Sequence, residues 1–328
     1  MSAPVRHQLP PDAHGVRRVE FHALGTACRI LFRQRDERTA LTFAADALTW
    51  LGAFEAKFSR FRETSLVSRI NAAAGRDWIE TDADLERMLD LAEGVHHLSR
   101  GILDATMLPL LRVWDWKQAH PALPTAAAIA TALALTGWSK VQRRPGAVYL
   151  PHAGMGLDFG GFGKEFAVDR LARMAMSRGI KDALIDLGRD IYALGGNGVH
   201  PFWHVGLETA HHPGQCGRGI ALSDRAISAS GDYERCFIHD GRRYGHIIDP
   251  RTGWPVANGV RACNVIAPSC LEAGIYSTAI CVLGAHEGLR FASSARHVEA
   301  LIQTDTGTLT SRNFTRWEVA NPALLTSL

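Results

Sequence analysis

The stretch Gly156-Leu-Asp-Phe-Gly-Gly-Phe-Gly-Lys-Glu-Phe-Ala-Val-Asp169 carries the clearest structural signal in this sequence. Leu157 and Phe159 alternate around Asp158 as at the end of a strand, and the apolar residues that follow have helical spacing. The glycines between these elements leave backbone N–H groups uncovered, so a phosphate could approach the start of the helix, where Lys164 would add positive charge. A glycine-rich turn with a solvated lysine fits the same residues, because the stretch matches neither a Walker loop nor the Rossmann fingerprint.

The pattern of elements around this stretch predicts an α+β fold with mixed or antiparallel sheets and flanking helices. Apolar stripes predict helices over 38–58, 81–98 and 269–283, and Asp240-Gly241 predicts a tight hairpin between strands at 235–239 and 242–248. Strand signals also run from Val148 to Phe159. We expect residues 1–18 to form a flexible lead and residues 19–328 a single domain, with two intimate lobes as the alternative.

The composition excludes several classes of protein. A formal net charge of +3, without a run of Lys or Arg, argues against nucleic acid as a partner. The six cysteines include no C-x-x-C pair, which argues against structural zinc and against a disulfide scaffold. No apolar segment is long enough to span a membrane, and no secretory signal is visible, so we expect a cytoplasmic protein.

Several polar side chains lie where predicted elements end, and these are candidates for chemistry. They are Asp104, Thr106, Asp158, Lys164, Ser230, Asp232, Tyr233, His246, Asp249 and Thr278. His246 could act as a general base or hold a phosphate oxygen, or it could be a strand histidine bonded to neighbouring backbone. A hydrolase nucleophile at Ser230 is not favoured, because Ser228 and Asp232 stand where a G-x-S-x-G elbow needs glycines.

Six short motifs occur in one order along the chain. They are Ala23-Leu-Gly-Thr26, Phe58-Ser-Arg-Phe61, Leu103-Asp-Ala-Thr106, Asp158-Phe-Gly-Gly-Phe-Gly-Lys164, Ser230-Gly-Asp-Tyr233 and Tyr244-Gly-His-Ile-Ile-Asp-Pro-Arg-Thr-Gly253. In this order the set resembles the ApbE family, whose members are FAD:protein FMN transferases. Each motif is weak by itself, but the six together are specific, and the resemblance runs from about Phe21 to Gly284.

The resemblance implies an enzyme that uses FAD as its substrate and Mg²⁺ as its metal. The hydroxyl of a Ser or Thr in an acceptor flavoprotein attacks the FMN phosphorus, and AMP leaves. The family pattern then gives the site residues. Catalytic roles fall to His246, Lys164 and Asp249. The Gly161 carbonyl and Thr278 fall at magnesium-ligand positions. The positions that contact FAD are Leu24, Phe61, Leu103, Asp104, Ala105, Asp158, Gly160, Lys164, Ser230, Tyr233, His246 and Ile248.

The sequence departs from the family pattern at the metal. The family usually has an aspartate four residues before Thr278, where this chain has Gly274, so we expect weakened magnesium binding. Glu272 is a poor replacement, because Ser269-x-x-Glu272 is a capping box and Glu272 lies about 200° around the helix from Gly274.

Two other departures are Glu165, where glycine is frequent, and Arg189, in a turn where the family often has Gly-Gly-Asn. Arg189 could contact phosphate or pair with Asp190, and we favour the pair.

Three activities remain open at this point. The first is FMN transfer to an acceptor protein. The second is FAD binding with lost or weakened transfer, because Gly274 leaves the metal site incomplete. The third is FAD pyrophosphatase activity, with water in place of the protein hydroxyl. The sequence does not name the acceptor.

Overall fold

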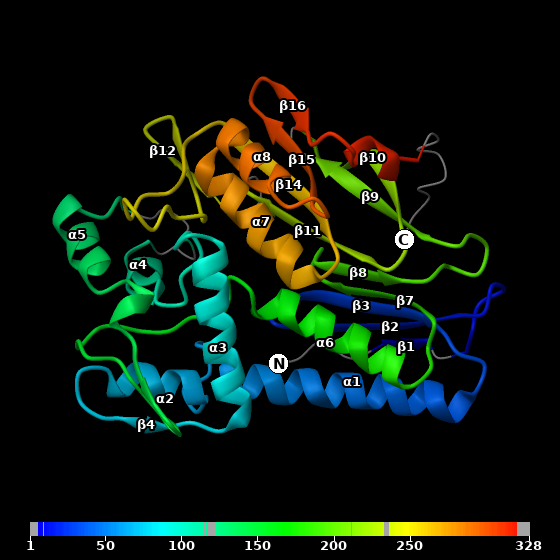
Figure 1. The fold of residues 1–328 in the computed structure, drawn as a ribbon, viewed down its shortest axis with the longest axis horizontal. Coiled ribbons are helices and arrows are strands. Elements are labelled where there is room, and N and C mark those ends of the chain that lie inside the picture. The colour runs from blue at the N-terminus through cyan, green and yellow to red at the C-terminus, as the bar shows by residue number, and fades with distance from the viewer. Residues whose placement is uncertain are drawn as a thin grey trace.

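An antiparallel sheet of nine strands lies at the centre of the computed structural model (Figure 1), which describes residues 6–8, 10–114, 116, 122–210, 212–232 and 236–319. In sheet order the strands are β1 (Arg6–Gln8), β2 (Val16–Ala23), β3 (Thr26–Arg33), β7 (Asp182–Leu187), β8 (Ile191–Leu194), β11 (Arg225–Gly231), β14 (Val260–Ala267), β15 (Glu299–Thr304) and β16 (Gly307–Thr310). Every neighbouring pair in it is antiparallel. The predicted α+β fold is confirmed.

Helices cover one face of this sheet. They are α1 (Glu37–Phe58), α6 (Gly163–Ser177), α7 (Cys270–Leu283) and α8 (Ala285–Ser293), and Figure 1 shows α1, α6 and α7 lying across the strands. Phe43 of α1 and Leu171 of α6 are fully buried in one cluster with Ile30 and Ile185 of the sheet. No helix in the described ranges is long and apolar enough to cross a membrane.

The opposite face of the sheet is covered by a hairpin. Its strands are β9 (Trp203–Thr209) and β10 (His212–Leu222), and η2 (Phe314–Trp317) packs beside them. Trp203 and Phe314 form a buried cluster with Leu31 and Leu184. Because side chains alternate along a strand, Ile30 faces the helices while Leu31 faces the hairpin, so β3 is buried on both sides.

A smaller lobe lies beside these layers, at the left of Figure 1. It contains α2 (Leu66–Ala73), α3 (Ala83–Leu98), α4 (Leu108–Val113), α5 (Ala126–Ala134), η1 (Trp138–Lys140) and a short sheet of β4 (Ile79–Glu80), β6 (Ala147–Tyr149) and β5 (Gln142–Arg144). The hairpin β12 (Cys236–His239) and β13 (Arg242–Gly245) turns at Asp240-Gly241, as predicted, and both turn residues have positive φ. Trp114 ties this lobe to the segment after the hairpin through a hydrogen bond from its Nε1 to the Gly253 carbonyl, 2.8 Å long.

Several boundaries differ from the sequence prediction. The second hairpin strand, predicted over 242–248, ends at Gly245. The predicted strand from Val148 ends at Tyr149, and residues 156–159 are irregular. The Leu157 amide donates to the Asn71 side chain at 2.6 Å and the Asp158 amide donates to the Ala105 carbonyl at 2.7 Å, so their partners are a side chain and a loop and not a neighbouring strand. At the N-terminus, β1 and the start of β2 at Val16 place part of the expected lead in the sheet.

Asp169 fixes α6 against the start of α7. Its carboxylate is buried and accepts hydrogen bonds from the amides of Cys270 and Leu271, at 2.7 and 3.0 Å. A carboxylate at a helix N-terminus satisfies N–H groups that have no partner within the helix and interacts favourably with the helix dipole. Burial raises the pKa of Asp169, and these two hydrogen bonds oppose that shift.

We predict that D169A lowers the free energy of unfolding by about 2 kcal/mol or more, because one buried and one partly buried N–H group lose their acceptor. M176A, on the exposed side of the same helix, should change it by less than about 0.5 kcal/mol. Urea denaturation of both variants measures this. Equal stability of D169A and the wild type would contradict the assigned role of Asp169.

Candidate functional site

Turns from distant parts of the sequence meet at one end of the large sheet. The β2–β3 turn at Leu24-Gly25 and the β7–β8 turn at 188–190 lie side by side, since a Cβ on Gly188 would be only 2.5 Å from Thr26 Oγ1. Leu24 has a positive φ of 53°, and its amide donates to Glu55 Oε2 at 3.3 Å. This end of the sheet also receives the N-terminus of α6 with Lys164.

Lys164 and Asp190 form an ion pair that joins α6 to the β7–β8 turn. The Asp190 side chain is 3% exposed and the Lys164 side chain 30% exposed. Ser228 of β11 donates its hydroxyl to the second oxygen of Asp190, so both carboxylate oxygens are bonded. Burial alone would lower the pKa of Lys164, but the negative charges of Asp190 and Glu165 outweigh it and raise that pKa above its ordinary value. Lys164 is therefore protonated and positively charged.

The start of α6 is open to a ligand. Its N-cap residue, Phe162, makes no side-chain capping hydrogen bond, and Gly160 and Gly161 before it are exposed. A Cβ on Gly161 would meet no atom within 4 Å, so there is free space beside its backbone. An uncapped helix N-terminus beside a held cation suits an anionic group such as a phosphate.

A cluster of hydroxyl groups joins β11 to α7. Ser230 lies two residues after Ser228, on the same side of β11, and its hydroxyl is 2.7 Å from Ser277 Oγ and 3.2 Å from Thr278 Oγ1. The Ser277 hydroxyl also donates to the Gly274 carbonyl at 3.1 Å. The predicted site residues Ser230 and Thr278 are thus brought together.

Glu165 points from α6 towards α7 at Gly274. It is 7% exposed, and a Cβ on Gly274 would lie 2.6 Å from its Cγ and 3.0 Å from its Oε1. Its Oε2 is buried and has no hydrogen-bond partner. Burial raises the pKa of Glu165 to about 8, with the Asp190 charge adding to the shift and Lys164 opposing it.

A second group of predicted residues surrounds Asp158. One Asp158 oxygen accepts from the Gly160 amide at 2.8 Å, and the other lies 2.8 Å from Arg60 Nε. The Arg60 guanidinium also stacks 4.2 Å above the ring centroid of Phe61, which is 63% exposed. Because the Asp158 amide bonds to Ala105, the turns that carry Phe61, Ala105 and Asp158 meet here.

The carboxylate of Asp104 is turned inward. One oxygen accepts from the amide and hydroxyl of Thr106, at 2.7 and 2.5 Å, and the other accepts from the Trp138 amide at 2.8 Å. Leu103 and Ala105 on either side are buried. The Asp104 side chain therefore fixes the shape of this loop.

His246 follows β13 directly and is half-buried. Its neighbour Gly245 packs against the end of β11, because a Cβ there would lie 2.7 Å from the Cβ of Asp232. This contact brings the end of β13, which His246 follows, next to the end of β11. Tyr233, also predicted for the site, lies outside the described residues.

Asp249 and Ile248 stand apart from the Lys164 cluster. The two Asp249 oxygens bond to the Arg251 guanidinium at 2.9 and 2.7 Å, which closes the turn after His246. Ile248 is buried with Leu110, Trp114 and Tyr244. Both residues therefore fix the path of the chain beyond His246.

Two expectations about charged side chains have clear outcomes. The predicted pair of Arg189 with Asp190 is wrong, because Arg189 binds Glu208 at 3.0 Å and Asp190 binds Lys164. Glu272 is engaged elsewhere, with Oε1 2.6 Å from His297 Nε2. Its amide donates to Ser269 Oγ at 3.2 Å, which is one of the two bonds of the predicted capping box.

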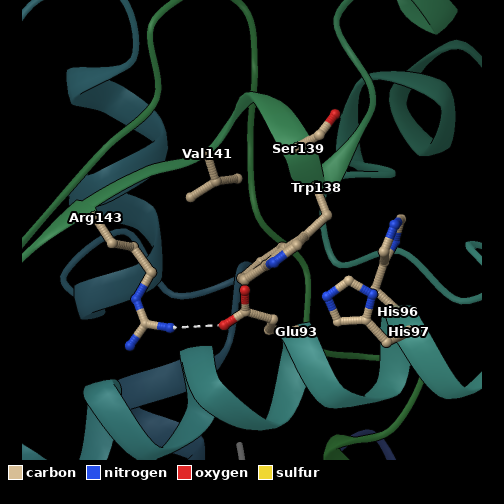
Figure 2. Close-up of a pocket in the computed structure, with 7 residues that line it drawn as sticks. All are labelled: Glu93, His96, His97, Trp138, Ser139, Val141 and Arg143. Atoms are coloured by element: carbon tan, nitrogen blue, oxygen red, sulfur yellow. Dashed lines mark ion pairs between the residues drawn. The ribbon is translucent and has the colours of Figure 1, made fainter.

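The structure also contains two cavities. Figure 2 shows the first, of about 400 Å³, where Trp138 and Val141 stand opposite His96 and His97 of α3 and Arg143 reaches Glu93. The second is a groove of about 700 Å³ on the hairpin side of the sheet, with Arg29, Arg189 and His200 in its wall. Neither is lined by a residue that the sequence assigned to the site.

Comparisons with known proteins identify relatives of this chain. The family model described as "ApbE family" matches residues 24–302. The chain belongs to the ApbE family. It is 30% identical over 295 residues to an FAD:protein FMN transferase of Treponema pallidum, covering 85% of this chain and 82% of that protein. A second relative with the same name, from Klebsiella pneumoniae, is 30% identical over 269 residues, which cover 80% and 77% of the two chains.

Solved structures of ApbE proteins have the same fold. The ApbE protein of Thermotoga maritima superposes with a TM-score of 0.83 at 28% identity, covering 93% of this chain and 99% of that one. The apo form of the flavinyl transferase ApbE of Pseudomonas stutzeri gives 0.82 at 25% identity, with coverages of 93% and 98%.

Sequence reasoning missed four residues of these clusters: Arg60, Glu165 as a side chain within the site, Asp190 as the partner of Lys164, and Ser228. Ser228 and Asp190 carry one usable signal, since each stands two residues or fewer from a motif or a glycine turn. The approach of Glu165 to Gly274 joins residues 109 positions apart and has no local signal.

We predict that Lys164 and Asp190 are energetically coupled. In a double-mutant cycle of K164A and D190A, the coupling should be about 2 kcal/mol, because each single variant leaves a poorly solvated charge without its partner. The pair Arg251–Asp249, in which the arginine side chain is 58% exposed, is the control and should give less than about 1 kcal/mol. Urea denaturation of all six variants measures both cycles. A Lys164–Asp190 coupling near zero would contradict this account.

Proposed function

We propose that the protein is an FAD:protein FMN transferase, which moves FMN from FAD to a hydroxyl of an acceptor flavoprotein and releases AMP. The observation that carries the proposal is the open N-terminus of α6 with Lys164 held beside it, at the junction of the family's motifs. This arrangement occurs in a member of the ApbE family whose relatives bear that name at 30% identity over most of the chain.

In this proposal the diphosphate of FAD binds at the start of α6. The N–H groups at the helix N-terminus and the Lys164 ammonium compensate the phosphate charge, and Asp190 keeps the ammonium in place. Phe61 and Leu24 supply apolar surface for the flat rings, and the 103–105 backbone and the Asp158–Gly160 turn form the wall between them.

His246 is assigned as the general base. It takes the proton of the acceptor hydroxyl as the hydroxyl oxygen bonds to the FMN phosphorus and the bond from that phosphorus to the AMP phosphate breaks. Asp249 acts by holding the turn after His246 through its bonds to Arg251. It is therefore a positioning residue and not a catalytic one.

The residues present fit a magnesium ion. In the described part of the chain no three His, Cys, Asp or Glu side chains gather to hold a metal, but Mg²⁺ commonly binds through one or two carboxylates with other oxygens and phosphates. Thr278 Oγ1, the Gly161 carbonyl beside its open space, and the orphaned Glu165 Oε2 are such oxygens. When bound, Mg²⁺ would neutralise phosphate charge in the transfer.

We predict that the protein, incubated with FAD, Mg²⁺ and an acceptor flavoprotein, adds the mass of FMN to the acceptor. H246A should lower the transfer rate by about a hundredfold or more, because the hydroxyl loses its base. H22A, at an exposed position of β2, is the control and should transfer at the wild-type rate. Mass spectrometry of the acceptor and chromatography of the nucleotides measure the outcome.

The other two activities give different products in the same assay. AMP and free FMN without a gain in acceptor mass would identify FAD pyrophosphatase activity. Intact FAD retained by the protein would identify a flavin-binding member without transfer. Either result with several acceptors would overturn the proposed function.

A further inference from the structure

The side chain of Glu165 occupies the space beside α7 that the side chain of residue 274 would otherwise fill. A Cβ on Gly274 would meet Glu165 Cγ at 2.6 Å, Oε1 at 3.0 Å and Cδ at 3.1 Å. Contacts under 3.0 Å are essentially never seen for a real Cβ, so Gly274 and Glu165 depend on each other. Residue 274 of α7 has no side chain, and the Glu165 carboxylate of α6 occupies that space.

This carboxylate reaches the face of α7 that carries hydroxyl groups. Residues three and four apart lie on one side of a helix, so Gly274 shares a face with Ser277 and Thr278. Thr278 Oγ1 and Ser277 Oγ both contact Ser230 Oγ, so the carboxylate stands one helical turn from a group of hydroxyl oxygens.

One carboxylate oxygen of Glu165, Oε2, has no hydrogen-bond partner. Lys164 is paired with Asp190, and both Asp190 oxygens are bonded. Glu165 Oε2 is buried and accepts no hydrogen bond, an arrangement that is costly for a polar atom unless a ligand completes it. A site with one unpaired carboxylate and several neutral oxygens suits a small, hard cation that also binds phosphate.

We propose that Glu165 is the carboxylate ligand of the magnesium ion, supplied from α6 in place of a ligand at position 274 of α7. This inference rests on the proposed function, because it assigns the metal to the reaction proposed above. It replaces the expectation that Gly274 leaves the metal site without a protein carboxylate. Thr278, one helical turn along α7 from Gly274, belongs to the same site.

The test is magnesium binding measured by isothermal titration calorimetry with MgCl₂, on the whole protein, alone and with FAD but no acceptor. E165Q keeps the shape of the side chain and removes its charge, so we expect Mg²⁺ affinity to fall at least about tenfold. E272Q is the matched control, because Glu272 is a carboxylate on α7 that bonds to His297, and its Mg²⁺ affinity should equal that of the wild type.

Folding is checked by the Tm of the metal-free proteins. A ligand role predicts that metal-free E165Q is at least as stable as the wild type and that Mg²⁺ no longer raises its Tm. A purely structural role predicts a lower Tm without metal and an unchanged Mg²⁺ affinity. That second result would overturn the proposal.

Moving the carboxylate from position 165 to position 274 tests whether both positions face the same magnesium site. In E165A/G274D the atoms that crowd residue 274 are gone, so the introduced aspartate has room and should recover Mg²⁺ affinity that E165A loses. G274D alone should have a lower Tm without metal than E165A/G274D, because its side chain collides with Glu165. A double variant as weak as E165A would overturn the shared site.

Transfer of FMN is measured separately so that the two proposals can fail independently. If Mg²⁺ binding depends on Glu165 but the protein transfers no FMN, the proposed transferase function is overturned and the role of Glu165 as a magnesium ligand is supported. Normal FMN transfer and normal Mg²⁺ affinity in E165Q would support the proposed transferase function and overturn the proposal that Glu165 is a magnesium ligand.

Discussion

The ion pair between Lys164 and Asp190 is the contact on which the geometry of the site depends. It joins the first turn of α6 to the β7–β8 turn, and Ser228 of β11 binds the same carboxylate. Three elements are therefore fixed around one charge pair. Because removing one partner would leave a poorly solvated charge, the pair holds the lysine where the helix begins, even without a ligand.

The same packing explains how α6 and α7 act as one unit. Asp169 caps α7 through two amides, and Glu165, one turn earlier on α6, lies against Gly274. One acidic residue thus fixes the start of α7, and the other faces its middle. A small residue on one helix and a long one on the other fill a single space, so a departure from a family motif at one position has to be judged together with its spatial neighbour.

Irregular backbone builds the wall of the site. Residues 156–159 form no strand, because their backbone groups bond elsewhere. The Asn71 side chain bonds to both the amide and the carbonyl of Leu157, and the Ala105 carbonyl accepts from the Asp158 amide. Arg60 and Phe61 then stack beside Asp158. Loops held in this way can present backbone groups and an exposed ring to a ligand, while the sheet and its helices stay closed around their cores.

The sequence by itself determined the fold class, the α6 helix with its glycine turn, the Asp240-Gly241 hairpin and the family, because these depend on local periodicity, turn residues and motif order. The tertiary structure alone decided which charges pair. Asp190 binds Lys164 and not Arg189, and Glu165 meets Gly274 across 109 residues of chain. Such contacts follow from how helices pack on a sheet, and the spacing of residues along one segment of sequence does not predict them.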